Sequence, residues 1–455
     1  MLNLDKGAEF RTTSAGPRGA WIAFAAYFAA LLVLTPLISS TPQFPWGTPL
    51  MALARATSFG DPVSFATGAL DIARHGWITP ENQWLIRLWP PGFMVLESVV
   101  VRLLGEDGPV LLPLLVLSAL GCATWMTLLR QYLLRSGNGP RLAALAPLLP
   151  FAFPLSWFFL LSPLGLAFGE TFSISLYLTA FLLVLLGLRA GAWWKAVLAA
   201  VLAGLAVAGA AYFRSQFELL VLFLTLGGGA IFVFATLAFL FRRKTFVGAR
   251  TLVIVAVTLV VTHAAMAPWR YHNFLHTQEP RWVYTSAVVF ENALTPEARL
   301  NSLGAGFIVA GGGHLACKLE PAYCGQKDEV HFYGAFRKNM GEWLAYKAQL
   351  VAKFWMAPPK HGALSSADVP SSVLQKALNL AFLAILLAGL WRLWAIRREP
   401  EFPLQAWVQL STYGCLLAVY ALVHLEARYF YLPKIFSVVA VASLMSPRRA
   451  GSSHA

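Results

Sequence analysis

The sequence is poor in charged residues and in cysteine. Only 12% of its 455 residues are Asp, Glu, Lys or Arg, whereas 58% are hydrophobic. That shortage of charge excludes a chain of several soluble domains, because such domains are about 25% charged on average. Four cysteines are too few for a disulfide framework. The composition instead predicts a polytopic membrane protein.

The sequence also lacks the signals of several kinds of binding site. The net charge is +14, but Lys and Arg punctuate apolar runs, whereas a nucleic-acid footprint needs a basic face on a soluble domain. The histidines have no metal-ligand spacing. We therefore expect no nucleic-acid partner and assign no metal or cofactor. The sequence neither indicates nor excludes the binding of a divalent metal ion.

Apolar stretches make up most of the chain. A hydrocarbon layer of about 30 Å takes about 20 helical residues at 1.5 Å each. Ten stretches meet this length: 20–38, 109–129, 142–161, 171–188, 196–213, 217–240, 251–268, 372–391, 403–424 and 430–446. The fold class predicted is therefore an all-α polytopic membrane protein with about ten transmembrane helices.

Charge on the connections predicts how these helices are oriented. Every second connection is short and rich in Arg or Lys: 130–141, 189–195, 242–250, 392–401 and the tail from 446. The positive-inside rule places these segments, with both termini, in the cytoplasm. Two long loops, 39–108 and 269–371, then lie on the outer face.

One apolar piece in each long loop is predicted to lie along the membrane surface. Residues 90–105 are too few to cross easily and include Glu97 and Arg102; if they crossed, the basic loops that follow would face outward. In residues 342–355, one helical face carries Trp343, Tyr346, Leu350 and Phe354. We expect both to be juxtamembrane helices of the outer face.

The first long loop contains the segment "DPVSFATGALDIARHGW". An Asp-Pro pair is typical of a helix start, so Asp61 is predicted to begin a helix. Asp71 and Arg74 are spaced to form a solvated pair near its end. Capping explains why an aspartate can be here, but not why "RLWPPG" and a second surface helix follow it.

This combination resembles the first outer loop of membrane glycosyltransferases of the GT-C superfamily. More narrowly, it resembles the clade of protein O-mannosyltransferases and lipid A aminoarabinose transferases, which use a sugar carried on a polyprenyl phosphate. The matching pieces are Asp61, "ALDIARHGW", Arg87 with Pro90-Pro91-Gly92, "LLGEDG" (103–108), Glu170 in "LGLAFGETF", Arg214 in "AYFRSQFE", "APWRYHN" (267–273) and "EARYFYLP" (426–433).

The resemblance implies a GT-C-like fold in three parts. Residues 1–268 would form the catalytic transmembrane module with the first periplasmic loop, 39–108. Residues 269–371 would form the second long periplasmic loop with its interfacial helix, and 372–455 the C-terminal spans and cytoplasmic tail. The implied setting is a bacterial inner membrane with the active site facing the periplasm.

The implied reaction is inverting transfer of a hexosyl or pentosyl group from a polyprenyl-phosphate sugar to a hydroxyl of a glycolipid, lipopolysaccharide or other glycan. Such a reaction needs a carboxylate to take the acceptor's proton. Asp61 is the candidate base, with Glu170 as a second acid of the site. Family members often carry two adjacent acids where this chain has Asp61 followed by Pro62, which leaves a single candidate base.

Four arginines at the outer ends of spans could bind the donor phosphate, because guanidinium groups bind phosphate bidentately. Arg87 and Arg270 resemble the family's phosphate-binding positions best, and Arg214 and Arg428 rank second. The alternative for each arginine is snorkelling to lipid headgroups, and the alternative for Glu170 is pairing with a helix dipole.

Three questions stay open at this level. A transporter or flippase also has many spans and few charges, although its charges should lie nearer the bilayer midplane. A polysaccharide ligase acting on polyprenyl-linked glycans shares the donor chemistry. In the second long loop, Cys317 and Cys324 form either a local disulfide or two free thiols.

Overall fold

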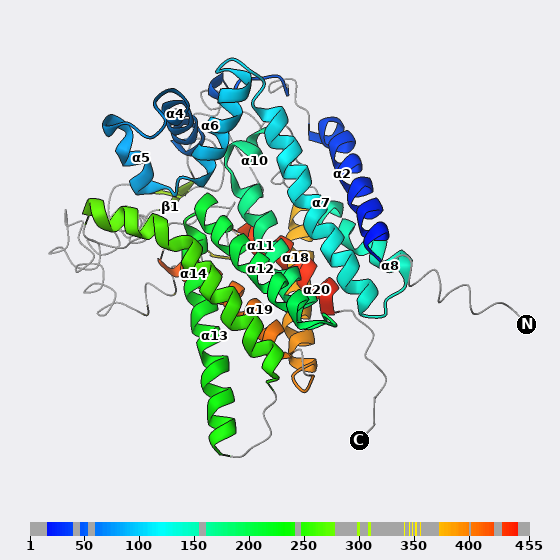
Figure 1. Cartoon of the computed structure of the whole chain (residues 1–455). Helices are drawn as coiled ribbons and strands as arrows, with labels where there is room; N and C mark the ends of the chain where they lie inside the picture. Colours follow the sequence, from blue (N-terminus) through cyan, green and yellow to red (C-terminus); the bar gives the residue numbers. More distant parts are fainter. Residues whose placement is uncertain are drawn as a thin grey trace, which may run out of the picture.

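The computed structural model describes residues 16–39, 46–52, 60–153, 161–241, 247–277, 298–300, 308–310, 373–399, 402–422 and 430–444, with six single positions between 341 and 355. This part of the chain is a helical bundle (Figure 1). The helices are α2 (Pro17–Ser39), α4 (Gly60–His75), η1 (Pro80–Asn82), α5 (Gln83–Leu88), α6 (Gly92–Leu104), α7 (Leu111–Arg135), α8 (Pro140–Leu145), η2 (Ala146–Ala152), α10 (Pro163–Ala167), α11 (Glu170–Leu188), α12 (Trp193–Phe213), α13 (Gln216–Leu240), α14 (Ala249–Thr277), α18 (Val373–Ala395), α19 (Phe402–Leu422) and α20 (Tyr431–Leu444).

Seven of the described helices are long and apolar enough to cross a membrane: α2, α7, α11, α12, α13, α14 and α18. Each overlaps one of the ten predicted stretches, and the predicted all-α polytopic class is confirmed. Two more predicted stretches correspond to α19 and α20, which are not among these seven helices. Helix α19 carries the buried polar residues Gln405, Gln409 and Thr412, and α20 has only 14 residues.

The predicted stretch at 142–161 is not one continuous helix in the described residues. The six-residue helix α8 gives way to the 3₁₀ helix η2, which contains Pro147 and Pro150. Proline has no amide proton and clashes with the preceding turn, so an α-helix cannot continue through this pair. Residues 154–160 lie outside the described part.

Helix α11 lies in the middle of the bundle, in contact with α7, α12, α14 and α20. Of its apolar stretch, 78% is buried inside the structure. Small residues of α12 allow such close packing; a Cβ added at Gly204 would lie 2.7 Å from the Thr258 carbonyl oxygen of α14. Glu170, the first residue of α11, is accordingly buried although it lies at the end of this central helix.

The helices of the first long loop gather at one end of the bundle, where Figure 1 shows α4, α5 and α6 together. Helix α6 has 13 residues, which makes it about 20 Å long and too short to cross a bilayer. It packs against α4 and contacts α12. This is the arrangement predicted for the juxtamembrane helix at 90–105; its counterpart at 342–355 lies largely outside the described residues.

The second long loop contributes a short antiparallel pair that the sequence did not predict. Strands β1 (Ala298–Leu300) and β2 (Ile308–Ala310) pair with Ala298 opposite Ala310. At three residues each, they do not change the helical character of the fold.

Candidate functional site

Three of the predicted site residues lie together. The Nη2 atom of Arg214 is 3.0 Å from Oε1 of Glu170, and its Nη1 atom is 3.5 Å from Oδ2 of Asp61. They come from the end of α12, the start of α11 and the first turn of α4. The structure therefore joins in one cluster an aspartate and an arginine that are 153 positions apart in sequence.

The turn that leads into α11 explains how Glu170 reaches Arg214. Gly169, which precedes it, has a φ of +70°, and a Cβ there would lie 2.8 Å from the Phe93 ring. Only glycine meets both conditions without strain. The carbonyl oxygen of Phe168 also accepts from Nη1 of Arg214, at 3.5 Å. One tight turn thus supplies two acceptors to the same guanidinium.

The "PPG" motif explains how α6 supports this cluster. A Cβ on Gly92 would lie 2.5 Å from the Tyr212 carbonyl oxygen, so the glycine lets α6 begin directly on the last turn of α12. The ring of Phe93 then packs edge-on against Phe65, with ring centres 5.3 Å apart. Because the Arg214 guanidinium carbon is 5.9 Å from the centre of the Phe65 ring, the charged cluster rests on aromatic side chains.

The three charges are not equally accessible. The exposed fraction of the side chain is 4% for Glu170 and 6% for Arg214, but 19% for Asp61. The closer, more deeply buried pair is Arg214 with Glu170, so Asp61 is the acid of the three that an incoming molecule can reach most readily.

Arg270 lies in a second polar cluster. Its Nη2 atom is 3.4 Å from Oε1 of Glu218, and its Nη1 atom is 3.3 Å from Nδ1 of His263. The two clusters are joined by the tight turn between α12 and α13, in which the Glu218 amide donates to the Ser215 carbonyl at 2.9 Å. Glu218, which contacts Arg270, is four residues after Arg214, so this turn connects the two clusters.

Sequence reasoning missed the roles of Glu218 and His263. Glu218 ends the "AYFRSQFE" motif, and His263 precedes Arg270 by seven residues. That spacing is two helical turns and places both side chains on one face of α14. The signal was therefore present for His263, as a polar residue at helical spacing from Arg270, whereas Glu218 is 52 positions from Arg270 and no helical spacing could reveal that contact.

The remaining predicted site residues are less completely described. Arg87 lies in α5, on the same side of the bundle as α4, but its side chain is outside the described part. Arg428, Cys317 and Cys324 also lie outside the described residues. Their proposed roles, including the disulfide, stay predictions.

The cluster does not suit a metal ion. Asp61 and Glu170 are the two predicted acids that converge, and the guanidinium of Arg214 contacts both. Among the described residues, no three His, Cys, Asp or Glu side chains are grouped as metal ligands.

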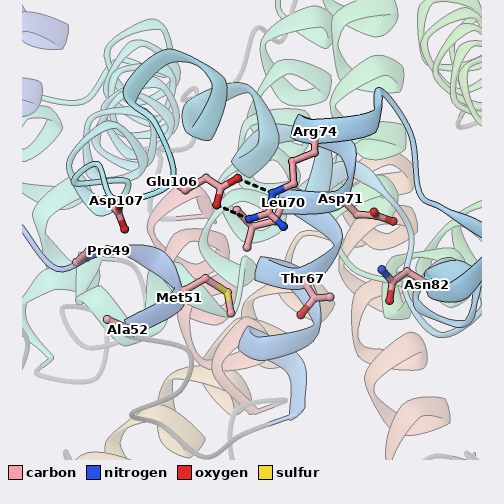
Figure 2. Close-up of a pocket in the computed structure, with 10 residues that line it drawn as sticks. All are labelled: Pro49, Met51, Ala52, Thr67, Leu70, Asp71, Arg74, Asn82, Glu106 and Asp107. Carbon is pink, nitrogen blue, oxygen red and sulfur yellow. Dashed lines mark hydrogen bonds and ion pairs between the residues drawn. The ribbon is translucent and has the colours of Figure 1, made fainter.

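A cavity of about 510 Å³ lies beside α4, toward the C-terminal end of this helix, whereas Asp61 is in its first turn (Figure 2). Thr67, Leu70, Asp71 and Arg74 line it from α4, and Glu106 lines it from the turn after α6. Asp61 is not among the lining residues, so the cavity is separate from the charged cluster.

The predicted ion pair between Asp71 and Arg74 is wrong. Arg74 instead forms a bidentate pair with Glu106, and Oδ2 of Asp71 accepts from the amide and the hydroxyl of Thr79 at 2.6 and 2.8 Å. Burial alone raises the pKa of Asp71, but hydrogen bonds from Thr79, His75 and other donors outweigh it and hold the pKa below its ordinary value. His75 lies four residues after Asp71 on α4 itself, whereas Thr79 is supplied by the chain beyond α4, which folds back in a way that helix spacing could not reveal.

Glu97 is a buried acid in α6. Its side chain has no exposed area, and neither carboxylate oxygen has a hydrogen-bond partner among the described residues. Burial raises the pKa of Glu97 well above its ordinary value.

No protein-family model matches the chain, and no curated protein is significantly similar to it in sequence. Among solved structures, the chain is similar to the archaeal oligosaccharyltransferase AglB from Archaeoglobus fulgidus in complex with an inhibitory peptide and a dolichol-phosphate. The TM-score is 0.47 at 14% identity, over 92% of this chain and 50% of that chain.

Two further structures of the oligosaccharyltransferase from this organism give the same TM-score of 0.47. One, in complex with Zn and sulfate, is 16% identical over 91% of this chain and 48% of that chain. The other, in the apo form, is 15% identical over 91% of this chain and 50% of that chain. The chain thus spans about half the length of these structures.

Proposed function

We propose that this chain is an integral membrane glycosyltransferase of the GT-C type. It would transfer a sugar from a polyprenyl-phosphate donor to an acceptor hydroxyl with inversion at the anomeric carbon. The observation that carries the proposal is the cluster of Asp61, Arg214 and Glu170 at one end of a membrane helix bundle, with Asp61 as its most exposed member.

Asp61 is the general base of this mechanism. Its carboxylate takes the proton of the acceptor hydroxyl as the hydroxyl oxygen forms a bond to the anomeric carbon. The bond from that carbon to the phosphate oxygen breaks, and its electron pair leaves with the polyprenyl phosphate. Placing a carboxylate at the end of the bundle lets an acceptor arrive from water and a donor from the bilayer.

Arg214 and Glu170 hold the base in place. The guanidinium already contacts two carboxylates and a carbonyl, so its charge is largely used within the cluster. We assign Arg214 to fixing Asp61, and Glu170 to balancing Arg214, rather than to binding the donor. This ranks Arg214 below Arg270 as a phosphate ligand.

The phosphate role falls to Arg270, whose side chain is 28% exposed. A cation at the outer end of α14, open on one side, suits a phosphate carried by a membrane lipid and can stabilise charge that builds on the leaving group. Arg87 and Arg428 are assigned the same role by resemblance alone.

The proposed setting is the bacterial inner membrane, with the cluster facing the periplasm. The acceptor would be an envelope glycolipid, lipopolysaccharide or similar glycan. This setting rests on the positive-inside pattern of the short loops and on the resemblance of the first long loop to GT-C enzymes.

The test is transfer by the full chain reconstituted in liposomes. The liposomes carry radiolabelled polyprenyl-phosphate sugars and an extract of envelope glycolipids. We expect consumption of the donor, release of polyprenyl phosphate and a product of inverted anomeric configuration. Movement of intact donor across the bilayer without consumption would indicate a flippase, and transfer only of whole glycans from a polyprenyl pyrophosphate would indicate a ligase.

A further inference from the structure

A chain of polar groups runs from Arg270 into the membrane between α13 and α14. It consists of Arg270, His263 and Thr225, with Glu218 on the other side of the guanidinium. We infer that His263 positions Arg270 to bind the donor phosphate and that Glu218 occupies the phosphate's place until the donor arrives. This inference rests on the proposed function, because it takes Arg270 as the phosphate ligand.

The contacts determine the state of the imidazole. Nδ1 of His263 lies 3.3 Å from Nη1 of Arg270, and a guanidinium has only donors, so Nδ1 must accept. An imidazole that accepts at one nitrogen is neutral and carries its proton on the other. Nε2 of His263 therefore donates to Oγ1 of Thr225, which lies 3.0 Å away.

The chain of hydrogen bonds has one direction from end to end. The hydroxyl of Thr225 donates to the Val221 carbonyl at 2.7 Å, so its oxygen is open to the imidazole proton. Each group thus has one role: Arg270 donates to His263, His263 to Thr225, and Thr225 to the backbone of α13. The backbone of one helix fixes the guanidinium of the next through two side chains.

The direction of the Arg270 side chain also differs from snorkelling. A snorkelling arginine extends its guanidinium out to the headgroups. Here Nη1 is bonded to a histidine seven residues earlier on α14, which is about 10 Å deeper along the helix axis. The side chain is thus held back toward the bundle instead of extending to the headgroups.

Glu218 makes a long contact with Arg270, similar in length to that of His263. Its oxygen is 3.4 Å from Nη2 of Arg270, whereas a strong charge-assisted hydrogen bond is about 2.7–2.9 Å. A phosphate can replace this contact on Nη2 while His263 keeps Nη1. The phosphate would thus meet a guanidinium already fixed in orientation, which lowers the entropy cost of binding.

The experiment measures binding of polyprenyl phosphate to the full chain in nanodiscs, together with transfer kinetics. Four variants are compared with wild type: His263→Leu, His263→Gln, Thr225→Val and Arg270→Ala. Glutamine can accept from Arg270 and donate to Thr225, whereas leucine can do neither.

We expect His263→Leu to weaken polyprenyl phosphate binding and to raise the donor KM about tenfold, because losing a hydrogen bond to a charged group weakens binding by about that factor. The value of kcat should stay within about twofold of wild type. His263→Gln should recover most of the loss. Thr225→Val should shift the donor KM in the same direction by a smaller factor. Thr124→Val is the matched control, because the Thr124 hydroxyl also donates to the carbonyl four residues earlier.

Two outcomes separate the inference from the proposed function. If Arg270→Ala weakens polyprenyl phosphate binding but His263→Leu and Thr225→Val do not, the positioning role is wrong and the phosphate role of Arg270 stands. If Arg270→Ala itself leaves binding and donor KM unchanged, the phosphate assignment is wrong and the inference fails with it. A His263→Gln variant as impaired as His263→Leu would also overturn the positioning role.

Discussion

The guanidinium of Arg214 lies 3.0 Å from the Glu170 carboxylate, and both side chains are almost fully buried. Removing one member of a buried ion pair leaves the other charge without compensation, at a cost of about 3–5 kcal/mol. We therefore expect Arg214→Met to lower the free energy of unfolding by about that amount, measured by denaturant or thermal unfolding in detergent micelles.

The double variant Arg214→Met with Glu170→Gln removes both charges and should recover much of this stability. Arg141→Gln, a change at an exposed arginine of α8, should leave stability unchanged. If the double variant is no more stable than Arg214→Met alone, the pair is not what holds this end of the bundle.

The turn at Gly169 gives a second prediction. Alanine there would need a left-handed φ and would meet the Phe93 ring, so Gly169→Ala should cost roughly 1–3 kcal/mol of stability. Transfer should fall as well, because Glu170 follows directly. The matched control is Gly229→Ala in α13, where an added Cβ has open space and alanine favours the helix. Equal stability of the two variants would contradict the role given to Gly169.

Glu97 gives a prediction about pH. Its pKa is raised in the folded state by burial, so the folded protein binds a proton that the unfolded chain releases once the pH exceeds the ordinary glutamate value of 4.5. Stability must therefore fall as the pH rises above that value. Glu97→Gln removes this dependence and should be more stable than wild type at pH 8.

The measurement is unfolding of both proteins between pH 4 and pH 8. Wild type and Glu97→Gln should converge toward pH 4, where the glutamate is protonated in both states. A constant difference across the range would mean that Glu97 is ionised in the folded protein, or that the glutamine acts through shape alone.

Local features of the sequence predicted the helices well. Runs of about 20 apolar residues indicated the spans. The Asp-Pro pair predicted that a helix starts at Asp61, and α4 begins one residue before it, at Gly60. Pro147 and Pro150 could also have predicted the break in the stretch at 142–161. These features depend on neighbouring residues only.

The side-chain partners could not be predicted in the same way. The sequence predicts that Arg214 lies at the outer end of a span. Its contact with Asp61, however, joins residues that only the packing of α4 and α6 on α12 brings together. Likewise, Arg74 pairs with Glu106 rather than with its helix neighbour Asp71. Such pairs depend on tertiary contacts between segments far apart in sequence.

The most direct test of the account is transfer by Asp61→Asn in the reconstituted assay. Asparagine can still accept a hydrogen bond from Arg214, but it cannot take a proton from the acceptor. Glu81→Gln, a change at an exposed acid of the same loop, is the control. We expect the rate to be at least about a hundredfold lower for Asp61→Asn, with unchanged stability and donor binding. An unchanged rate would contradict Asp61 as the base and, with it, the proposed glycosyltransferase mechanism.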